Sequence, residues 1–178
     1  IVYGLFGAGF ILDIVYNLSV SLGVQSAAGF SVLSTVIVLA IMIIPTMTVI
    51  AEVAIRSVDK SLIQGSLALG ATQTQTHFKV VLAAAKSGIF TAAILGVGRA
   101  LGEATAVALV AGSRRSGITF NLFDTTATLT STMLLGMKET VGLDYTIRFS
   151  IGLVLMVIIL LTNLTLNFIK RKVGRVYA

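Results

Sequence analysis

Four long apolar runs constrain what this chain can fold into: residues 1–22, 30–51, 87–112 and 149–169. A helix needs about 20 mostly apolar residues to cross about 30 Å of hydrocarbon, and each run meets that length. A backbone inside lipid must satisfy its own hydrogen bonds, which a helix does within a single segment. The sequence therefore predicts an all-α membrane protein, a multi-pass helical bundle with four spans in the 178 residues.

The composition agrees with a membrane environment and excludes several kinds of site. The chain is 56% hydrophobic and only 11% charged, whereas about 25% of the residues in a soluble domain are charged. It has no cysteine, which excludes disulfides, thiolate metal ligands and cysteine nucleophiles. The chain starts at Ile1 and enters an apolar run without a charged region, so we expect an N-terminally truncated piece rather than a signal peptide. Pro45, inside the second run, predicts a kink or a local break.

The cationic residues predict an orientation. Two groups flank the apolar runs: Arg56, Lys60, Lys79 and Lys86 in the segment 53–86, and Lys170, Arg171, Lys172 and Arg175 after the fourth run. Because lysine and arginine are enriched in cytoplasmic loops, we expect both regions on the cytoplasmic side. This clustering at helix ends accounts for the net charge of +6, so nucleic acid is not an expected partner.

Two charged residues interrupt the third run, Arg99 and Glu103. Arg99 lies 12 residues after Ser87, about 18 Å along a helix, so we expect it near mid-membrane, where a charge costs roughly 2.5–3.5 kcal/mol. Residues four apart share a helical face, so the two side chains can pair. One interpretation is that Arg99 lines a polar path and binds a tetrahedral oxyanion, which Glu103 helps to hold or release. The alternative is a buried ion pair that only sets helix register.

The small residues of the third run predict close helix packing. Gly98 and Gly102 have the GxxxG spacing that lets helix backbones approach each other in membranes. The surrounding GVGRALG is not a dinucleotide fingerprint, because its glycines have the wrong spacing and no strand precedes them. Packing between helices is therefore the predicted role of both glycines.

The remaining polar residues indicate no catalytic or metal chemistry. His77 is the only histidine and has no second ligand at a suitable spacing, so we expect no metal site. Walker A, HExxH and GxSxG motifs are absent, so we expect neither an enzyme nor a cofactor bound by this chain. Asp13 fits a water-filled cavity and a membrane interface equally well. Arg114 and Arg115 fit a solvated external loop, with an anion-attracting mouth as the alternative.

The polar segment 64–85, QGSLALGATQTQTHFKVVLAAA, resembles the cytoplasmic coupling loop of ABC-transporter permeases, whose motif is E-A-A, three residues, glycine, nine residues and I-x-L-P. Gly70 and Leu82 match it, Val80 replaces the isoleucine, and Ala83 stands where the proline would be. Three residues stand in for E-A-A: Gln64, Gly65 and Ser66. With VYGLFG, IMIIPTMTVIAEVAI and GRALGEATAVALVAG, nearly the whole chain is similar to the PstC type of phosphate permease, and the PstA type is somewhat less close.

The resemblance implies a MetI-like fold of about six spans, of which four are present here, and a binding-protein-dependent type I importer. It implies phosphate as the substrate, with Arg99 and Glu103 on its path. The implied partners are an ATPase dimer that uses ATP and Mg²⁺, a second permease subunit, an extracytoplasmic phosphate-binding protein and membrane lipid. The implied location is the cytoplasmic membrane of a prokaryote. Sulfate and molybdate are also tetrahedral oxyanions, and an ion channel or a secondary transporter is the alternative of a different class.

Local signals predict how the segment 53–86 would contact an ATPase. Asp59 is a suitable N-cap for a short helix over 60–69, Gly70 can adopt the left-handed conformation that ends it, and a second helix follows from about Thr74. An apolar knob on the first helix would insert into a groove of the partner; the alternative is a connector packed on its own permease. The residues expected in this contact are Leu62, Ile63, Gln64, Gly65, Ser66, Leu67, Gly70 and Leu82.

Overall fold

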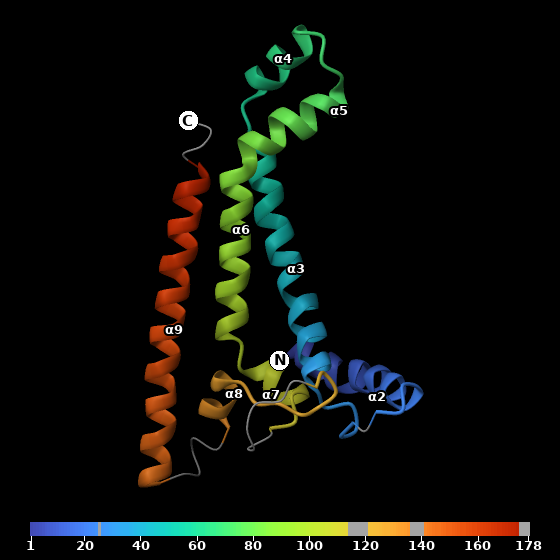
Figure 1. The fold of residues 1–178 in the computed structure, drawn as a ribbon, viewed down its shortest axis with the longest axis vertical. Coiled ribbons are helices and arrows are strands. Elements are labelled where there is room, and N and C mark those ends of the chain that lie inside the picture. Colours follow the sequence, from blue (N-terminus) through green and yellow to red (C-terminus); the bar gives the residue numbers. More distant parts are fainter. Residues whose placement is uncertain (25, 114–120, 136–140, 175–178) are drawn as a thin grey trace. The chain divides into compact units, whose positions relative to one another are not determined.

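A computed structural model describes residues 1–24, 26–113, 121–135 and 141–174, with side chains as far as 171 (Figure 1). In chain order the elements are α1 (Val2–Phe6), the π-helix η1 (Gly7–Ile11), α2 (Leu12–Ser21), α3 (Val32–Arg56), α4 (Lys60–Ala68), α5 (Gln73–Gln75), the π-helix η2 (Thr76–Val81), α6 (Leu82–Gly102), α7 (Thr105–Val110), α8 (Leu129–Leu134) and α9 (Leu143–Gly174). These described ranges contain isolated β-bridges but no strand. The all-α prediction is therefore confirmed.

Four helical runs in the described residues are long and apolar enough to cross a membrane: Val2–Ser21, Val32–Arg56, Gln73–Gly102 and Leu143–Arg171. Between 0 and 33% of the residues in their most apolar windows are buried, so most of their apolar surface faces outward. Water would make that exposure unfavourable, whereas lipid is a suitable solvent for it. The predicted multi-pass membrane protein with four spans is confirmed, although the third helix ends at Gly102 instead of continuing to residue 112.

Helix α3 remains continuous at its proline. The ring of Pro45 removes one backbone donor from the interior of the helix, yet the helix runs unbroken from Val32 to Arg56. The break that the sequence allowed at this position is therefore absent.

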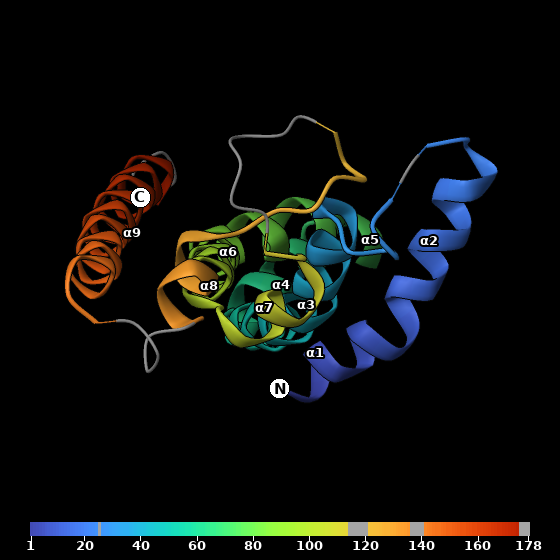
Figure 2. The ribbon, with the colours of Figure 1, turned by 90° about the horizontal axis from the view of Figure 1, so that it is seen from below.

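The structure divides into two compact units, and three helices, α3, α6 and α9, contribute residues to both. Unit 1 comprises residues 1–43 and 99–160, and unit 2 comprises 44–98 and 161–178. In unit 1, α1, η1 and α2 form one continuous helical run (Figure 2). Its apolar face forms a core with α3 and α7, made of Ile11, Leu12, Val15, Val38, Ala106 and Val110.

Gly29 holds the turn that leads into α3 close to α2. Its φ is +83°, and a Cβ at this position would overlap the backbone carbonyl of Leu12. The Gly29 carbonyl accepts hydrogen bonds from the hydroxyls of Ser34 (2.6 Å) and Ser31 (3.2 Å). A side chain at position 29 would therefore face both a strained backbone and a steric clash.

We expect Gly29→Ala to destabilise unit 1 by about 2–5 kcal/mol, because left-handed backbone strain contributes roughly 1–2 kcal/mol and overpacking roughly 1–3 kcal/mol. Thermal unfolding in detergent, followed by circular dichroism, measures the effect. The matched control is Gly9→Ala, since a Cβ at Gly9 would meet nothing within 4 Å. Equal melting temperatures for the two variants would contradict the structural role of Gly29.

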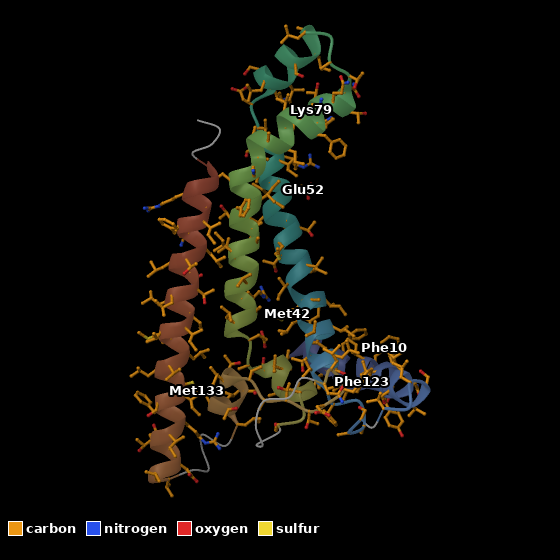
Figure 3. The ribbon with its side chains drawn as sticks, in the orientation of Figure 1. Phe10, Met42, Glu52, Lys79, Phe123 and Met133 are labelled. Carbon is orange, nitrogen blue, oxygen red and sulfur yellow. The ribbon has the colours of Figure 1, made fainter. Side chains whose placement is uncertain are left out.

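Unit 2 contains the polar segment between the second and third spans. Helices α4 and α5 lie together at one end of α6 (Figure 1). The hydroxyls of Ser66 on α4 and Thr76 on η2 are 2.9 Å apart and share a hydrogen bond. Below them α6 packs closely on α3, because a Cβ at Gly88 would overlap the side chain of Ala54. Figure 3 labels Lys79 near α4 and Glu52 on α3.

Candidate functional site

The third span breaks beside its two charged residues. Helix α6 ends at Gly102 and α7 begins at Thr105. Between them, the Glu103 carboxylate accepts hydrogen bonds from the Thr105 hydroxyl (2.8 Å) and from the Ala106 backbone N–H (3.0 Å). A helix leaves its first N–H groups without partners, so Glu103 satisfies one of the donors of α7.

Helix α8 reinforces this break. The hydroxyl of Thr130 donates a 2.9 Å hydrogen bond to the backbone carbonyl of Glu103. The sequence analysis placed both charges on one continuous helix, whereas α6 ends at Gly102 and only Arg99 belongs to it. Glu103 lies outside α6, and its carboxylate bonds to the start of α7.

Arg99 lies in the last turn of α6 and its side chain is exposed in the described chain. The residues from Ser87 to Arg99 all lie within α6, so the expected distance of about 18 Å along a helix applies, and the position near mid-membrane stays a prediction. The negative end of the helix dipole favours a cation in the last turn by about 0.3–1 kcal/mol. The residue is exposed in the described chain, as a binding group must be.

The close packing expected at Gly98 and Gly102 is not found within the described chain. A Cβ at Gly98 would meet only the Asn163 side chain, at 3.8 Å, and one at Gly102 would meet nothing within 4 Å. Small residues make tight helix contacts elsewhere. In unit 1, a Cβ at Gly7 would lie 2.6 Å from Val38 and 3.0 Å from Val110.

The two helices predicted in the segment 53–86 are confirmed. Helix α4 runs from Lys60 to Ala68, and the Asp59 carboxylate accepts a 2.9 Å hydrogen bond from the Ser61 backbone N–H. This hydrogen bond lowers the pKa of Asp59 below its usual value, so the cap is ionised at neutral pH. Gly70 has φ +84° just after the helix end, as expected of a terminating glycine. A second helical run begins at Gln73, capped by Thr72.

The side chains expected to contact an ATPase fall into two groups in the structure. Leu62 (50% exposed), Leu67 (39%) and Leu82 (43%) are accessible, and Gln64, Gly65 and Gly70 are also exposed. Ile63 is half-buried, and so is Ser66, whose hydroxyl bonds to Thr76. The accessible leucines can therefore contact a partner, while Ser66 also holds α4 against η2.

Sequence reasoning missed two exposed apolar side chains in the same region. Leu69 is 91% exposed at the end of α4, and Phe78 is 71% exposed on η2. Both are large apolar residues inside a short polar segment, and this contrast is the sequence signal that could have identified them. Exposing a large aromatic ring is unfavourable in water, so such residues often mark contact surfaces.

Sequence reasoning also missed Arg148, which lies one residue before the fourth apolar run, 149–169. Its guanidinium donates hydrogen bonds to the carbonyls of Thr132 (2.5 Å) and Leu135 at the end of α8. Arg148 therefore satisfies carbonyls that a helix end leaves without partners. Arg114 and Arg115, which the sequence analysis expects in an external loop, lie outside the described residues.

The described side chains form no metal centre, since no group of three histidine, cysteine, aspartate or glutamate residues occurs among them. His77 is exposed on η2, and Asp13 is exposed in the first turn of α2.

Comparison with known proteins gives a consistent set of relatives. Residues 1–175 match the family described as binding-protein-dependent transport system inner membrane component. A probable ABC transporter permease protein, YqgH, from Bacillus subtilis is 39% identical over 177 residues, covering 97% of this chain and 55% of that protein. The phosphate transport system permease protein PstC 1 of Mycobacterium tuberculosis is 34% identical over 151 residues, covering 83% and 45%.

A further relative is archaeal. The probable phosphate transport system permease protein PstC of Methanocaldococcus jannaschii is 35% identical over 147 residues, covering 81% of this chain and 46% of that protein. The chain thus spans about half the length of these relatives. No solved structure matches it.

Proposed function

Because the chain belongs to the family of binding-protein-dependent transport system inner membrane components, we propose that it forms part of the permease subunit of an ATP-driven importer and that the substrate is inorganic phosphate. The printed names of the mycobacterial and archaeal relatives support phosphate as the substrate. Several apolar helices and the family together establish a multi-pass membrane protein. The cytoplasmic membrane, with the segment 53–86 and the C-terminal end on the cytoplasmic side, is its proposed location.

The observation that carries the proposal is the exposed Arg99 beside the break between α6 and α7. A guanidinium presents a planar set of donors that fits two oxygens of a phosphate at once. Glu103 lies in the same break, and its carboxylate accepts a hydrogen bond from the start of α7. In this proposal Arg99 contacts the passing anion, and Glu103 holds the backbone around it in place.

Family membership supports the proposed partners. An ATPase dimer that uses ATP and Mg²⁺ binds α4 and η2 through Leu62, Leu67, Leu69 and Phe78, and a second permease subunit and an extracytoplasmic phosphate-binding protein complete the importer. Apolar side chains on a short helix fit a groove in a partner. Hydrolysis belongs to the partner, so this subunit is a transport protein rather than an enzyme.

Uptake of radiolabelled phosphate into proteoliposomes containing the assembled complex tests the proposal. Uptake should require ATP and the binding protein and should persist in an excess of sulfate or molybdate. Equal competition by those anions would contradict phosphate as the substrate. Uptake by this subunit alone, without ATP, would instead indicate a channel or a secondary transporter.

A further inference from the structure

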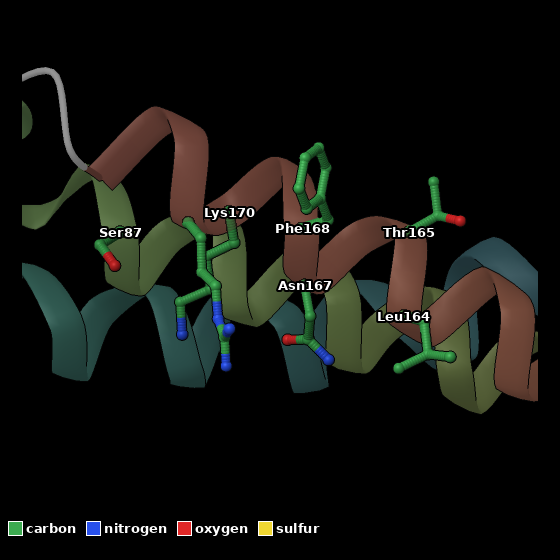
Figure 4. A pocket seen from close by; sticks show the side chains of 7 residues that line it. Ser87, Leu164, Thr165, Asn167, Phe168 and Lys170 are labelled. Atoms are coloured by element: carbon green, nitrogen blue, oxygen red, sulfur yellow. The ribbon is translucent and has the colours of Figure 1, made fainter.

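A pocket in unit 2 lies outside the residues assigned to transport and coupling. Its volume is about 960 Å³, and it lies between Ser87 on α6 and the last turns of α9 (Figure 4). In Figure 4, Leu164, Asn167 and Lys170 point to the same side of α9. Residues that line the pocket and matter to its chemistry are Ser87, Leu164, Asn167, Phe168, Lys170 and Arg171.

The lining changes from apolar to cationic along α9. Leu164 and Phe168 are 58% and 69% exposed, and Lys170 and Arg171 follow at the end of the candidate span Leu143–Arg171. Whichever side of the membrane this end faces, it lies at the boundary between acyl chains and headgroups. None of the most apolar window of that helix is buried, so lipid can reach this wall of the pocket.

The pocket volume favours an amphipathic ligand over a free ion. The pocket volume of about 960 Å³ is far larger than inorganic phosphate needs. A free ion would contact only the cationic end of the lining. A ligand with a phosphate at one end and a hydrocarbon chain at the other complements both parts of the lining.

We propose that this pocket binds one anionic phospholipid. Its phosphate contacts Lys170 and Arg171, and Ser87 and Asn167 are placed to hydrogen-bond phosphate or ester oxygens. The first part of an acyl chain lies along Leu164, which points to the same side of α9 as Asn167 and Lys170. Basic pockets between membrane helices at the headgroup level suit anionic lipids. This site is independent of the substrate that the permease transports.

Native mass spectrometry of the detergent-solubilised permease complex, titrated with phosphatidylglycerol, measures the binding. The double variant Lys170→Gln, Arg171→Gln should bind roughly thirtyfold more weakly, because it removes two cations at the headgroup level. Ser87→Trp keeps both charges but fills the pocket, and it should weaken binding at least about tenfold. Phosphatidylcholine, which has no net charge, should bind the unmodified complex weakly.

The matched control is Lys60→Gln, Lys79→Gln, which removes the same charge from the segment 53–86 and should change the affinity less than about twofold. A similar loss of lipid affinity in the control would show that only general charge attraction is measured, and it would overturn the proposed site. Unchanged affinity in Ser87→Trp would also overturn it, because the lipid would then bind elsewhere. Displacement of the lipid by millimolar inorganic phosphate would show that the pocket selects the free anion.

Discussion

Replacing Arg99 with alanine is expected to lower the initial rate of ATP-driven phosphate uptake roughly ten- to hundredfold. Hydrogen bonds to a charged group contribute about 1.5–3 kcal/mol, and the variant removes every such bond that the guanidinium makes with the anion. Arg99→Lys should recover part of the rate, because it keeps the charge but loses the planar pair of donors. The measurement is radiolabelled phosphate uptake in proteoliposomes, with subunit assembly checked by co-purification.

Arg56→Ala is the control for this series. Arg56 is exposed and pairs with Glu52 at 2.8 Å within one helix, and such exposed pairs contribute little. It should leave uptake within about twofold of the unmodified complex. Unimpaired uptake in an assembled Arg99→Ala complex would remove Arg99 from the substrate path and leave it as a residue of the α6 terminus.

The second large effect is expected on α4. A double change of Leu62 and Leu67 to aspartate should abolish ATP-driven uptake and reduce co-purification of the ATPase by roughly thirtyfold or more, since central apolar contacts often contribute 2 kcal/mol or more. Both side chains are exposed, so the change should not unfold the permease. Phosphate uptake and pull-down of the ATPase measure the two consequences.

The matched control is Val141→Asp, because Val141 is 87% exposed and lies outside the segment 53–86. It introduces the same kind of charge at an apolar surface position and should leave the ATPase bound. A photoreactive residue at position 67 gives an independent measurement, with a crosslink to the ATPase expected in the assembled complex. An ATPase that stays bound to the double aspartate variant, without any crosslink from position 67, would show that α4 packs on its own permease.

Much of the fold followed from signals contained within single segments. Long apolar runs identified the four spans, and the cap at Asp59 and the stop at Gly70 located α4 to within one residue. These signals are readable because hydropathy, capping and left-handed glycine each act within a few residues along the chain.

The break in the third span after Gly102 could not be predicted from signals within its own segment. The segment GRALGEATAVALVAG has no proline and is rich in helix-forming alanine and leucine, so a continuous helix was the natural expectation. The break is held by contacts distant in sequence. Thr130 bonds to the Glu103 carbonyl, and α7 packs on the first helical run, where a Cβ at Gly4 would lie 2.9 Å from Ala106.

The sequence by itself therefore determined that the chain is a helical membrane protein with four spans, a capped helix between the second and third, and a charged pair near the third. Only the tertiary structure decided the relation between those charges. Arg99 is exposed in the last turn of α6, while Glu103 lies outside that helix and accepts a hydrogen bond from the start of α7. The physical reason is that a helix continues until other contacts satisfy its terminal groups better, and here those contacts come from α1, η1 and α8.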